Sequence, residues 1–161
     1  MAYTAKVEGM AELSRKLSDL GEAAPGVASA SLYEGAGVMA DAVSQAVHGI
    51  ATSPFRYAAG GTTRKPSPEE KALLEGASKG VAKFRKNGVT VDTSVGLANS
   101  GYGEINGKTK PIPQIANAIN SGTSFMQKQP FFRKAVSKAQ GPALSKIDSE
   151  IQKRIEQITN E

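Results

Sequence analysis

The residue types that most often carry catalysis are scarce in this chain. It has 161 residues, one histidine (His48) and no cysteine, which excludes a disulfide framework and a cysteine zinc site. His48 lies in an alanine-rich stretch, where only Ser44 has the spacing of a relay partner. A histidine in such a setting usually makes an ordinary hydrogen bond, so we assign it no function.

Two other kinds of chemistry would need residues that are far apart in the sequence. A hydrolytic carboxylate pair would require Glu104 and Asp92 to meet across a sheet. The glycines at 101, 103 and 107 lack the GxGxxG spacing, and neither GxxxxGKS nor GxxxxGKT occurs. We therefore expect a protein that is not an enzyme, with no cofactor and no metal site. A hydrolase is the third interpretation, and it depends on a partner carboxylate for Glu104 or Asp92.

Basic residues are concentrated in one part of the chain. The net charge is +5; residues 53–90 carry 8 basic and 3 acidic side chains, whereas residues 1–52 carry 3 and 6. A phosphate-contacting patch is one interpretation of this excess. Aromatic residues are sparse around it, which favours a solvated face instead. The candidate patch residues are Arg64, Lys65, Lys79, Lys83, Arg85 and Lys86.

Apolar residues at helical spacing predict helices in the N-terminal third. The first set is spaced 3, 4 and 3 apart and comprises Met10, Leu13, Leu17 and Leu20. We expect Gly21 to end this helix and Pro25 to open a second, long helix that runs to about Ala51. The second helix is rich in alanine, with glycine at 35 and 37, so we expect another backbone to pack closely against it.

The middle of the chain predicts a loop, a helix and a small sheet. Residues 52–68 contain three prolines and two adjacent glycines and are interpreted as a mobile loop. Ser67 is placed to cap a helix over 67–87, in which Lys79, Lys83 and Lys86 would share one face. Alternation over 88–98 predicts a strand, which a turn at 99–101 would pair with 102–105, and Asn106-Gly107 is a second turn signal.

The C-terminal third predicts three helices. The first covers 111–120, the second runs from Pro130 to an interruption at Gly141-Pro142, and the third is an amphipathic helix over 143–159. We therefore expect one domain over 1–161 of the α+β class. In it, a small antiparallel sheet is packed by a long helix of the N-terminal half and a C-terminal helix, with the middle helix inserted. Aromatic residues make up 6% of the chain, which predicts a thin core that depends on partners.

No membrane segment is expected. No apolar run approaches the about 20 residues that a bilayer span needs, and the first residues have neither a basic n-region nor an apolar h-region. The sequence predicts a protein made and folded in a reducing cytoplasm.

The most distinctive pattern lies at 115–135. An apolar helix stops at Gly122-Thr123-Ser124, a linker follows, and Gln129-Pro130-Phe131-Phe132-Arg133 opens the last helix. This pattern resembles the minor-tail or tail-completion proteins of long-tailed bacteriophages, the group similar to the lambda tail protein Z. The order of the other segments is similar too: a leading VEGMAEL, a long alanine-rich helix and a VTVDTSVG strand.

The resemblance implies a structural protein of the virion tail or neck, assembled in the bacterial host cytoplasm. It implies a ring of six copies that contacts the tail tube or tail terminator protein and the head–tail connector or stopper protein, and so joins the tail to the DNA-filled head. Ring subunits use two different complementary surfaces. The expected interface residues are Gly122, Thr123, Phe125, Phe131, Phe132 and Arg133.

We expect Phe125, Phe131, Phe132 and Arg133 to form one packing hub that positions the 122–124 turn. The alternative function, from a different class, is a small basic DNA-binding module. It would use Lys79, Lys83, Arg85 and Lys86.

Overall fold

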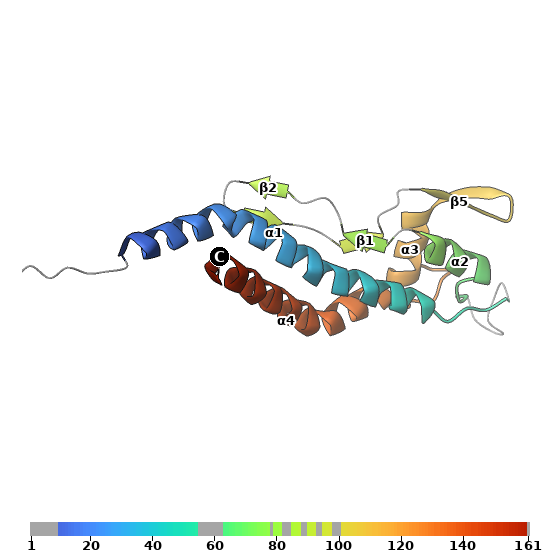
Figure 1. Ribbon diagram of the computed structural model, residues 1–161. Helices are drawn as coiled ribbons and strands as arrows, with labels where there is room; N and C mark the ends of the chain where they lie inside the picture. Colours follow the sequence, from blue (N-terminus) through green and yellow to red (C-terminus); the bar gives the residue numbers. More distant parts are fainter. Residues whose placement is uncertain are drawn as a thin grey trace, which may run out of the picture.

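Two long helices dominate the architecture. The computed structural model describes residues 10–54, 63–77, 79–81, 85–87, 90–92, 95–97 and 101–160. Helices α1 (Met10–His48) and α4 (Phe131–Asn160) run side by side in opposite directions (Figure 1). At the end where α4 begins, α2 (Pro68–Gly76), α3 (Ile112–Ser121) and a β-hairpin gather into a head. The predicted α+β class is confirmed.

The strands are short and pair locally. Within the described residues they form three separate two-stranded antiparallel sheets, so the expected single sheet is wrong. The pairs are β1 (Lys79–Val81) with β4 (Val95–Leu97), β2 (Arg85–Asn87) with β3 (Thr90–Asp92), and β5 (Tyr102–Ile105) with β6 (Lys108–Pro111).

The hairpin β5–β6 corrects the predicted strand pairing. Residues 102–105 pair with 108–111 and not with the 88–98 segment, which contributes β3 and β4 instead of one strand. Asn106 and Gly107 have φ values of 52° and 70°, as a two-residue type I′ turn requires. This turn connects β5 directly to its pairing partner β6. The turn predicted at Asn106-Gly107 is therefore confirmed.

Both long helices continue through residues that were expected to end them. Helix α1 runs through Gly21 and Pro25, and α4 runs through Gly141 and Pro142. Each proline removes one backbone donor, but packing of α1 against α4 stabilises the turns on either side. The separate helix over 143–159 is therefore the second half of α4.

The middle helix is shorter than predicted. It starts with the expected cap, because the Glu70 N–H donates to Ser67 Oγ at 3.1 Å and the Ser67 N–H donates to the Glu70 carboxylate at 2.9 Å. It ends at Gly76, and Ala77 is already extended. Residues 79–81 and 85–87 are strands, so the predicted helix over 67–87 is wrong beyond Gly76.

The core has two parts of different character. In the head, buried residues from all the surrounding elements form one cluster: Val47, Ile50, Leu74, Ala77, Ile105, Ile112, Ile115, Ala116, Ile119, Met126 and Phe131. Between α1 and α4 the buried apolar side chains are small: Ala36, Ala40, Val43, Ala135, Ala139 and Ala143. The large apolar residues therefore hold the head together, and the helix pair is held by close approach.

That approach is closest at Gly35. A Cβ atom added there would lie 2.6 Å from Ile147 Cδ1 and 3.0 Å from the Ala143 carbonyl oxygen. Gly37, two residues further along the same helix, has no heavy atom within 4 Å of the corresponding position. The two glycines thus differ in packing while sharing the same helical backbone.

We expect Gly35→Ala to lower the free energy of unfolding by about 1–3 kcal/mol, because the added methyl overpacks the α1–α4 contact. Gly37→Ala should raise it by up to about 1 kcal/mol through helix propensity alone. Urea unfolding of the two variants checks this. Equal stabilisation by both would show that α4 does not approach α1 at Gly35.

Candidate functional site

The 115–135 segment forms the junction between the head and the helix pair. Helix α3 ends at Gly122, whose N–H donates to the Ala118 carbonyl at 2.9 Å. The linker then folds back, because the Gln129 N–H donates to the Ile119 carbonyl at 2.8 Å. Helix α4 begins at Phe131, so two successive helices are tied together through a linker pinned at both ends.

Gly122 is required at its position for two reasons. Its φ is 78°, a left-handed conformation that favours glycine. A Cβ atom there would also lie 2.9 Å from Lys128 Cβ and 3.2 Å from the Lys128 nitrogen. The predicted role of Gly122 as the helix C-cap is confirmed, and the returning linker supplies a second constraint that the sequence pattern did not reveal.

The expected interface residues take different positions. Phe131 is 7% exposed in the core cluster and Phe132 packs against that cluster, whereas Phe125 is 67% exposed. Arg133 and Thr123 are exposed. The single hub of Phe125, Phe131, Phe132 and Arg133 is therefore not formed. The turn is positioned instead by Thr123, whose Oγ1 accepts from the Phe125 and Met126 N–H groups at 3.2 and 3.0 Å.

Two further segments meet this linker. Residue 64 forms a parallel bridge with it, as the Arg64 N–H donates to the Phe125 carbonyl and the Gln127 N–H donates to the Arg64 carbonyl, both at 2.8 Å. Gln129 closes a ring of two hydrogen bonds with the Ala51 backbone at 2.8 and 3.0 Å. The chain after α1, the chain before α2 and the linker are thereby joined.

A buried ion pair fixes the start of α2 beside the linker. Glu70 is 3% exposed, and its carboxylate receives both terminal nitrogens of Arg64, at 2.6 and 2.5 Å. Burial would raise the pKa of the Glu70 carboxyl, but the hydrogen bonds from Arg64 and the Ser67 N–H, with the Arg64 charge, outweigh it and hold the pKa below its ordinary value.

The candidate phosphate-contacting patch is not assembled on one helix face. Lys79 lies in β1, Arg85 and Lys86 lie in β2, and Lys83 falls outside the described residues. The predicted shared face of Lys79, Lys83 and Lys86 is wrong because α2 stops at Gly76. Arg64 is committed to Glu70, and Lys65 is exposed.

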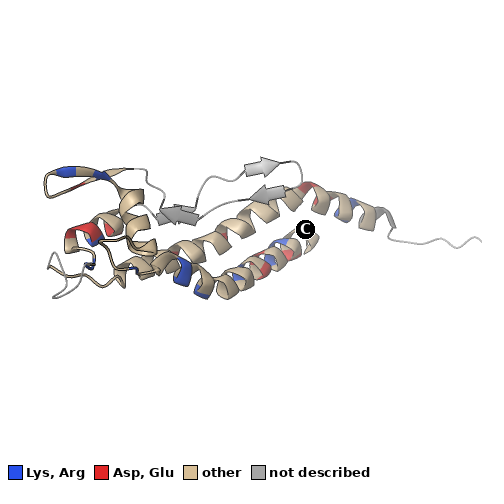
Figure 2. Cartoon of the chain, turned by 180° about the vertical axis from the view of Figure 1, so that it is seen from behind, with Lys and Arg blue, Asp and Glu red and all other residues tan. Residues whose placement is uncertain are grey.

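A different group of cations gathers where α4 begins. It lines a groove of about 640 Å³ together with Asn120, Ser121, Pro130 and Ser137. All four cations are exposed, and none makes an ion pair with another residue in the described part of the chain. Figure 2 shows blue along this end of α4. We call Lys128, Arg133, Lys134 and Lys138 the cationic cluster.

The cationic cluster had a signal in the sequence. Lys134 and Lys138 are four residues apart and so lie on one helix face. The sequence prediction did not include this cluster because the basic excess is largest in another segment, residues 53–90.

An apolar groove runs between α1 and α4 beside this cluster. Its volume is about 790 Å³. Its rims carry exposed Asp41 and Gln45 of α1 and exposed Lys134 and Lys138 of α4, and Lys128 and Gln129 of the linker also line it. Most of the lining is apolar and small. The lining residues with apolar side chains, which we call the alanine groove, are Val38, Ala42, Ala46, Ile50, Pro130, Phe131, Ala135, Ala139 and Pro142.

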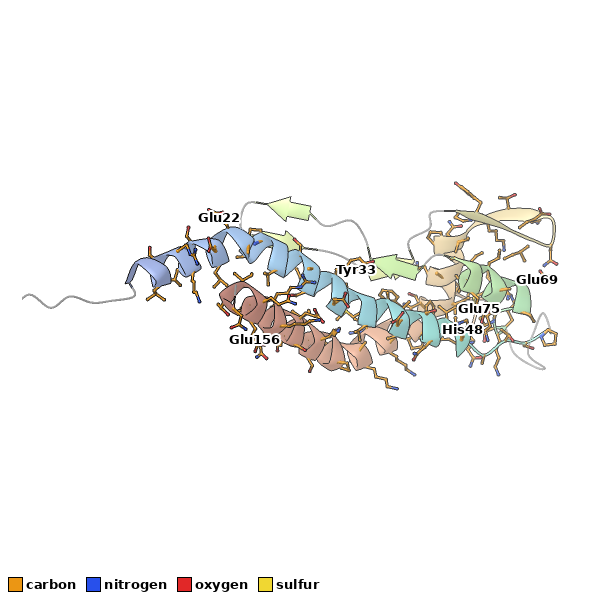
Figure 3. All side chains as sticks on the ribbon, in the orientation of Figure 1. Glu22, Tyr33, His48, Glu69, Glu75 and Glu156 are labelled. Carbon is orange, nitrogen blue, oxygen red and sulfur yellow. The ribbon has the colours of Figure 1, made fainter. Side chains whose placement is uncertain are left out.

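The residues considered for catalysis do not converge. His48 Nδ1 lies 2.9 Å from Glu75 Oε1, in an exposed contact between the ends of α1 and α2 (Figure 3). Glu104, on β5, is opposite Thr109, whereas Asp92, on β3, is opposite Arg85. The two carboxylates therefore belong to separate sheets. Among the described residues, no three His, Asp or Glu side chains gather as metal ligands, and no helix has the length and apolarity of a membrane span.

Comparison with known proteins adds no constraint. No family model, no curated protein and no solved structure matches the chain. The function must therefore be argued from the residues and their geometry.

We expect Glu70→Gln to lower the free energy of unfolding at pH 7 by about 2 kcal/mol, since a charge-assisted hydrogen bond of Arg64 is lost. The native pKa of Glu70 lies below its ordinary 4.5, so this contribution is complete above pH 4.5 and is lost as the pH falls through the native pKa. The difference between wild type and variant should shrink on acidification. Urea unfolding from pH 7 to pH 3 measures it, with exposed Glu69→Gln as the matched control; a gap independent of pH would contradict the assignment.

Proposed function

We propose that this protein is a structural subunit of a bacteriophage virion, a tail-completion or neck-ring protein that helps join the tail to the DNA-filled head. The proposal rests chiefly on residues 115–135. The segment whose pattern resembles those proteins is also the segment that ties α3, α4 and the chain before α2 into one unit.

The shape and surface of the chain suit a ring subunit. The helix pair has a thin core, so it stands to gain from burial against a neighbour. Several large apolar side chains are more than half exposed on different parts of the molecule: Leu13, Leu17, Tyr33, Tyr102, Phe125 and Leu144. Ring subunits need two distinct complementary surfaces, and residues of this kind are suited to both.

In this proposal the protein assembles in the bacterial host cytoplasm and ends in the tail or neck of the virion. Six copies form the ring. One side of the ring contacts the tail tube or tail terminator protein, and the other contacts the head–tail connector or stopper protein. Phe125, exposed beside the pinned linker, is the residue that we assign to one of these contacts.

Complementation of a phage that lacks this gene tests the proposal. Phe125→Ala should leave thermal unfolding unchanged, because the side chain is exposed, and should give tailless heads together with headless tails in electron micrographs. Exposed Gln127→Ala, in the same linker, is the control and should restore joined virions. Gly122→Val and Phe131→Ala should also fail, but through loss of the junction. The proposal would be refuted if joined virions form with each of the three variants that are expected to fail, Phe125→Ala, Gly122→Val and Phe131→Ala.

A second candidate function, a DNA-binding module, is favoured by one observation. The cationic cluster presents four unpaired charges in a groove without a carboxylate. Lys134 and Lys138 are about 6 Å apart along α4, at 1.5 Å per residue, and each DNA strand carries a phosphate about every 3.4 Å. Aromatic side chains are absent from the groove lining, so the contact would be with the backbone of duplex DNA and not with its bases.

We expect Lys134→Glu with Lys138→Glu to abolish binding to duplex DNA at low salt. For wild type, the logarithm of the affinity should fall with the logarithm of the salt concentration, with a slope of about −0.9 for each phosphate contacted. Lys65→Glu, an exposed cation outside the cluster, serves as the control. No wild-type binding at low salt would remove this second function.

A further inference from the structure

Two apolar surfaces lie at opposite ends of α1, and we propose that they bind each other between two copies of this chain. The first surface, the leucine stripe, consists of Leu13, Leu17 and Leu20. The second is the alanine groove. This inference deepens the proposed ring, because it names the contact that would join one subunit to the next.

The leucine stripe is largely uncovered within the described chain. Leu13 is 52% exposed and Leu17 is 60% exposed. Helix α4 ends beside this part of α1, where Lys16 Nζ donates to the Thr159 carbonyl at 2.9 Å. The first turns of α1 extend past that end (Figure 1). Leu13 and Leu17 are thus exposed near the end of α1 that extends past α4, and Leu20, on the same face, is half-buried.

The alanine groove has the dimensions for a helix with such a stripe. Its α1 wall runs from Val38 to Ala46, about 12 Å at 1.5 Å per residue. The leucine stripe spans Leu13 to Leu20, about 10 Å on the same scale. Alanines on both walls let a third helix axis approach closely, and leucine side chains then fill the space between the walls.

Charge places no obstacle to this contact. The leucine stripe is flanked by Ser14 on one side and by Lys16 on the other, and Asp41 in the groove lining carries the opposite charge to Lys16. Asp19 is two residues after Leu17, about 200° around the helix, and so faces away from the groove. Lys134 and Lys138 stand on the rim, where their stems can cover apolar surface while their charged ends stay in water. The docked helix therefore need not bury the charged ends of these two lysines.

The two surfaces cannot meet within one chain. Leu17 and Ala42 belong to the same continuous helix and are separated by 25 residues, about 37 Å along its axis. The groove of one copy must therefore receive the stripe of another. Since stripe and groove are different surfaces, every copy can donate and accept at once, which is the head-to-tail contact that closes rings.

Disulfide trapping tests the contact. Because the chain has no cysteine of its own, only the introduced residues can form the disulfide. One preparation carries Leu17→Cys and the other, with an affinity tag that changes its mass, carries Ala42→Cys. A disulfide requires Cα atoms within about 7 Å. We expect mild oxidation of the equal mixture to give a disulfide-linked heterodimer of summed mass on a denaturing, non-reducing gel, and either variant alone to give little covalent dimer.

The matched control replaces Leu17→Cys by Asp19→Cys, which lies on the opposite face of the same turn, and should give little heterodimer. Adding Leu13→Glu to the Leu17→Cys chain should reduce trapping without altering thermal unfolding, since Leu13 is exposed. Three results would overturn the inference: no heterodimer at any attainable concentration, equal trapping through position 19, or self-trapping of Leu17→Cys that exceeds the heterodimer.

The inference and the proposed function can fail separately. Consider a double variant, Leu13→Glu with Leu17→Glu and no introduced cysteine, in the complementation test. If it restores joined virions, the leucine stripe is not the ring contact, although the protein still joins heads to tails. If trapping succeeds in solution but Phe125→Ala also restores joined virions, the contact between copies stands and the assigned joining surface falls. Binding of the stripe by another protein, with no heterodimer, likewise rejects a second copy as the occupant.

Discussion

The close approach of α1 and α4 is the constraint on which the rest of the structure depends. At Gly35 the two helices come so near that a methyl group would meet Ile147, and most of the surrounding buried apolar positions are alanines. Close-packed backbones hold the pair through many small dispersion contacts instead of a few large apolar side chains. The cost is a core that removes little apolar surface from water, so the large residues must act elsewhere.

They act in the head, where three polar arrangements keep the segments in register. Gln129 binds the backbone after α1, Arg64 bridges to the linker, and Glu70 joins Arg64 to the cap of α2. Among the described residues of the head, each buried side-chain polar atom has a partner, which is the condition for burying it at little cost. The linker between α3 and α4 is therefore fixed by contacts with the chain after α1 and with the chain before α2. Because α4 begins at the end of this linker, the same contacts set the position of α4 relative to the head.

Sequence reasoning succeeded where the signal is local. The Ser67 cap, the Asn106-Gly107 turn and the Gly122 C-cap each depend on residues within a few positions of one another. It failed where distant packing decides. Pro25 and Pro142 do not break their helices because the opposite helix stabilises them, and that helix lies more than a hundred residues away. The functional surfaces were missed for the same reason, since the alanine groove exists only when α1 and α4 are side by side.

Glu70 illustrates the same point for charge. Its place in the first turn of a helix predicts a solvated carboxylate, yet Arg64 buries it, and one cation of the candidate patch is thereby consumed. Within the described residues, four cations that make no ion pair gather at the start of α4 instead, where Lys134 and Lys138 line both the cationic groove and the alanine groove. A helix docked in the alanine groove would pack against the stems of these two lysines and leave their charged ends at the rim. Assembly and contact with a polyanion are then compatible, because repeated subunits would align the cationic clusters along one surface without neutralising them.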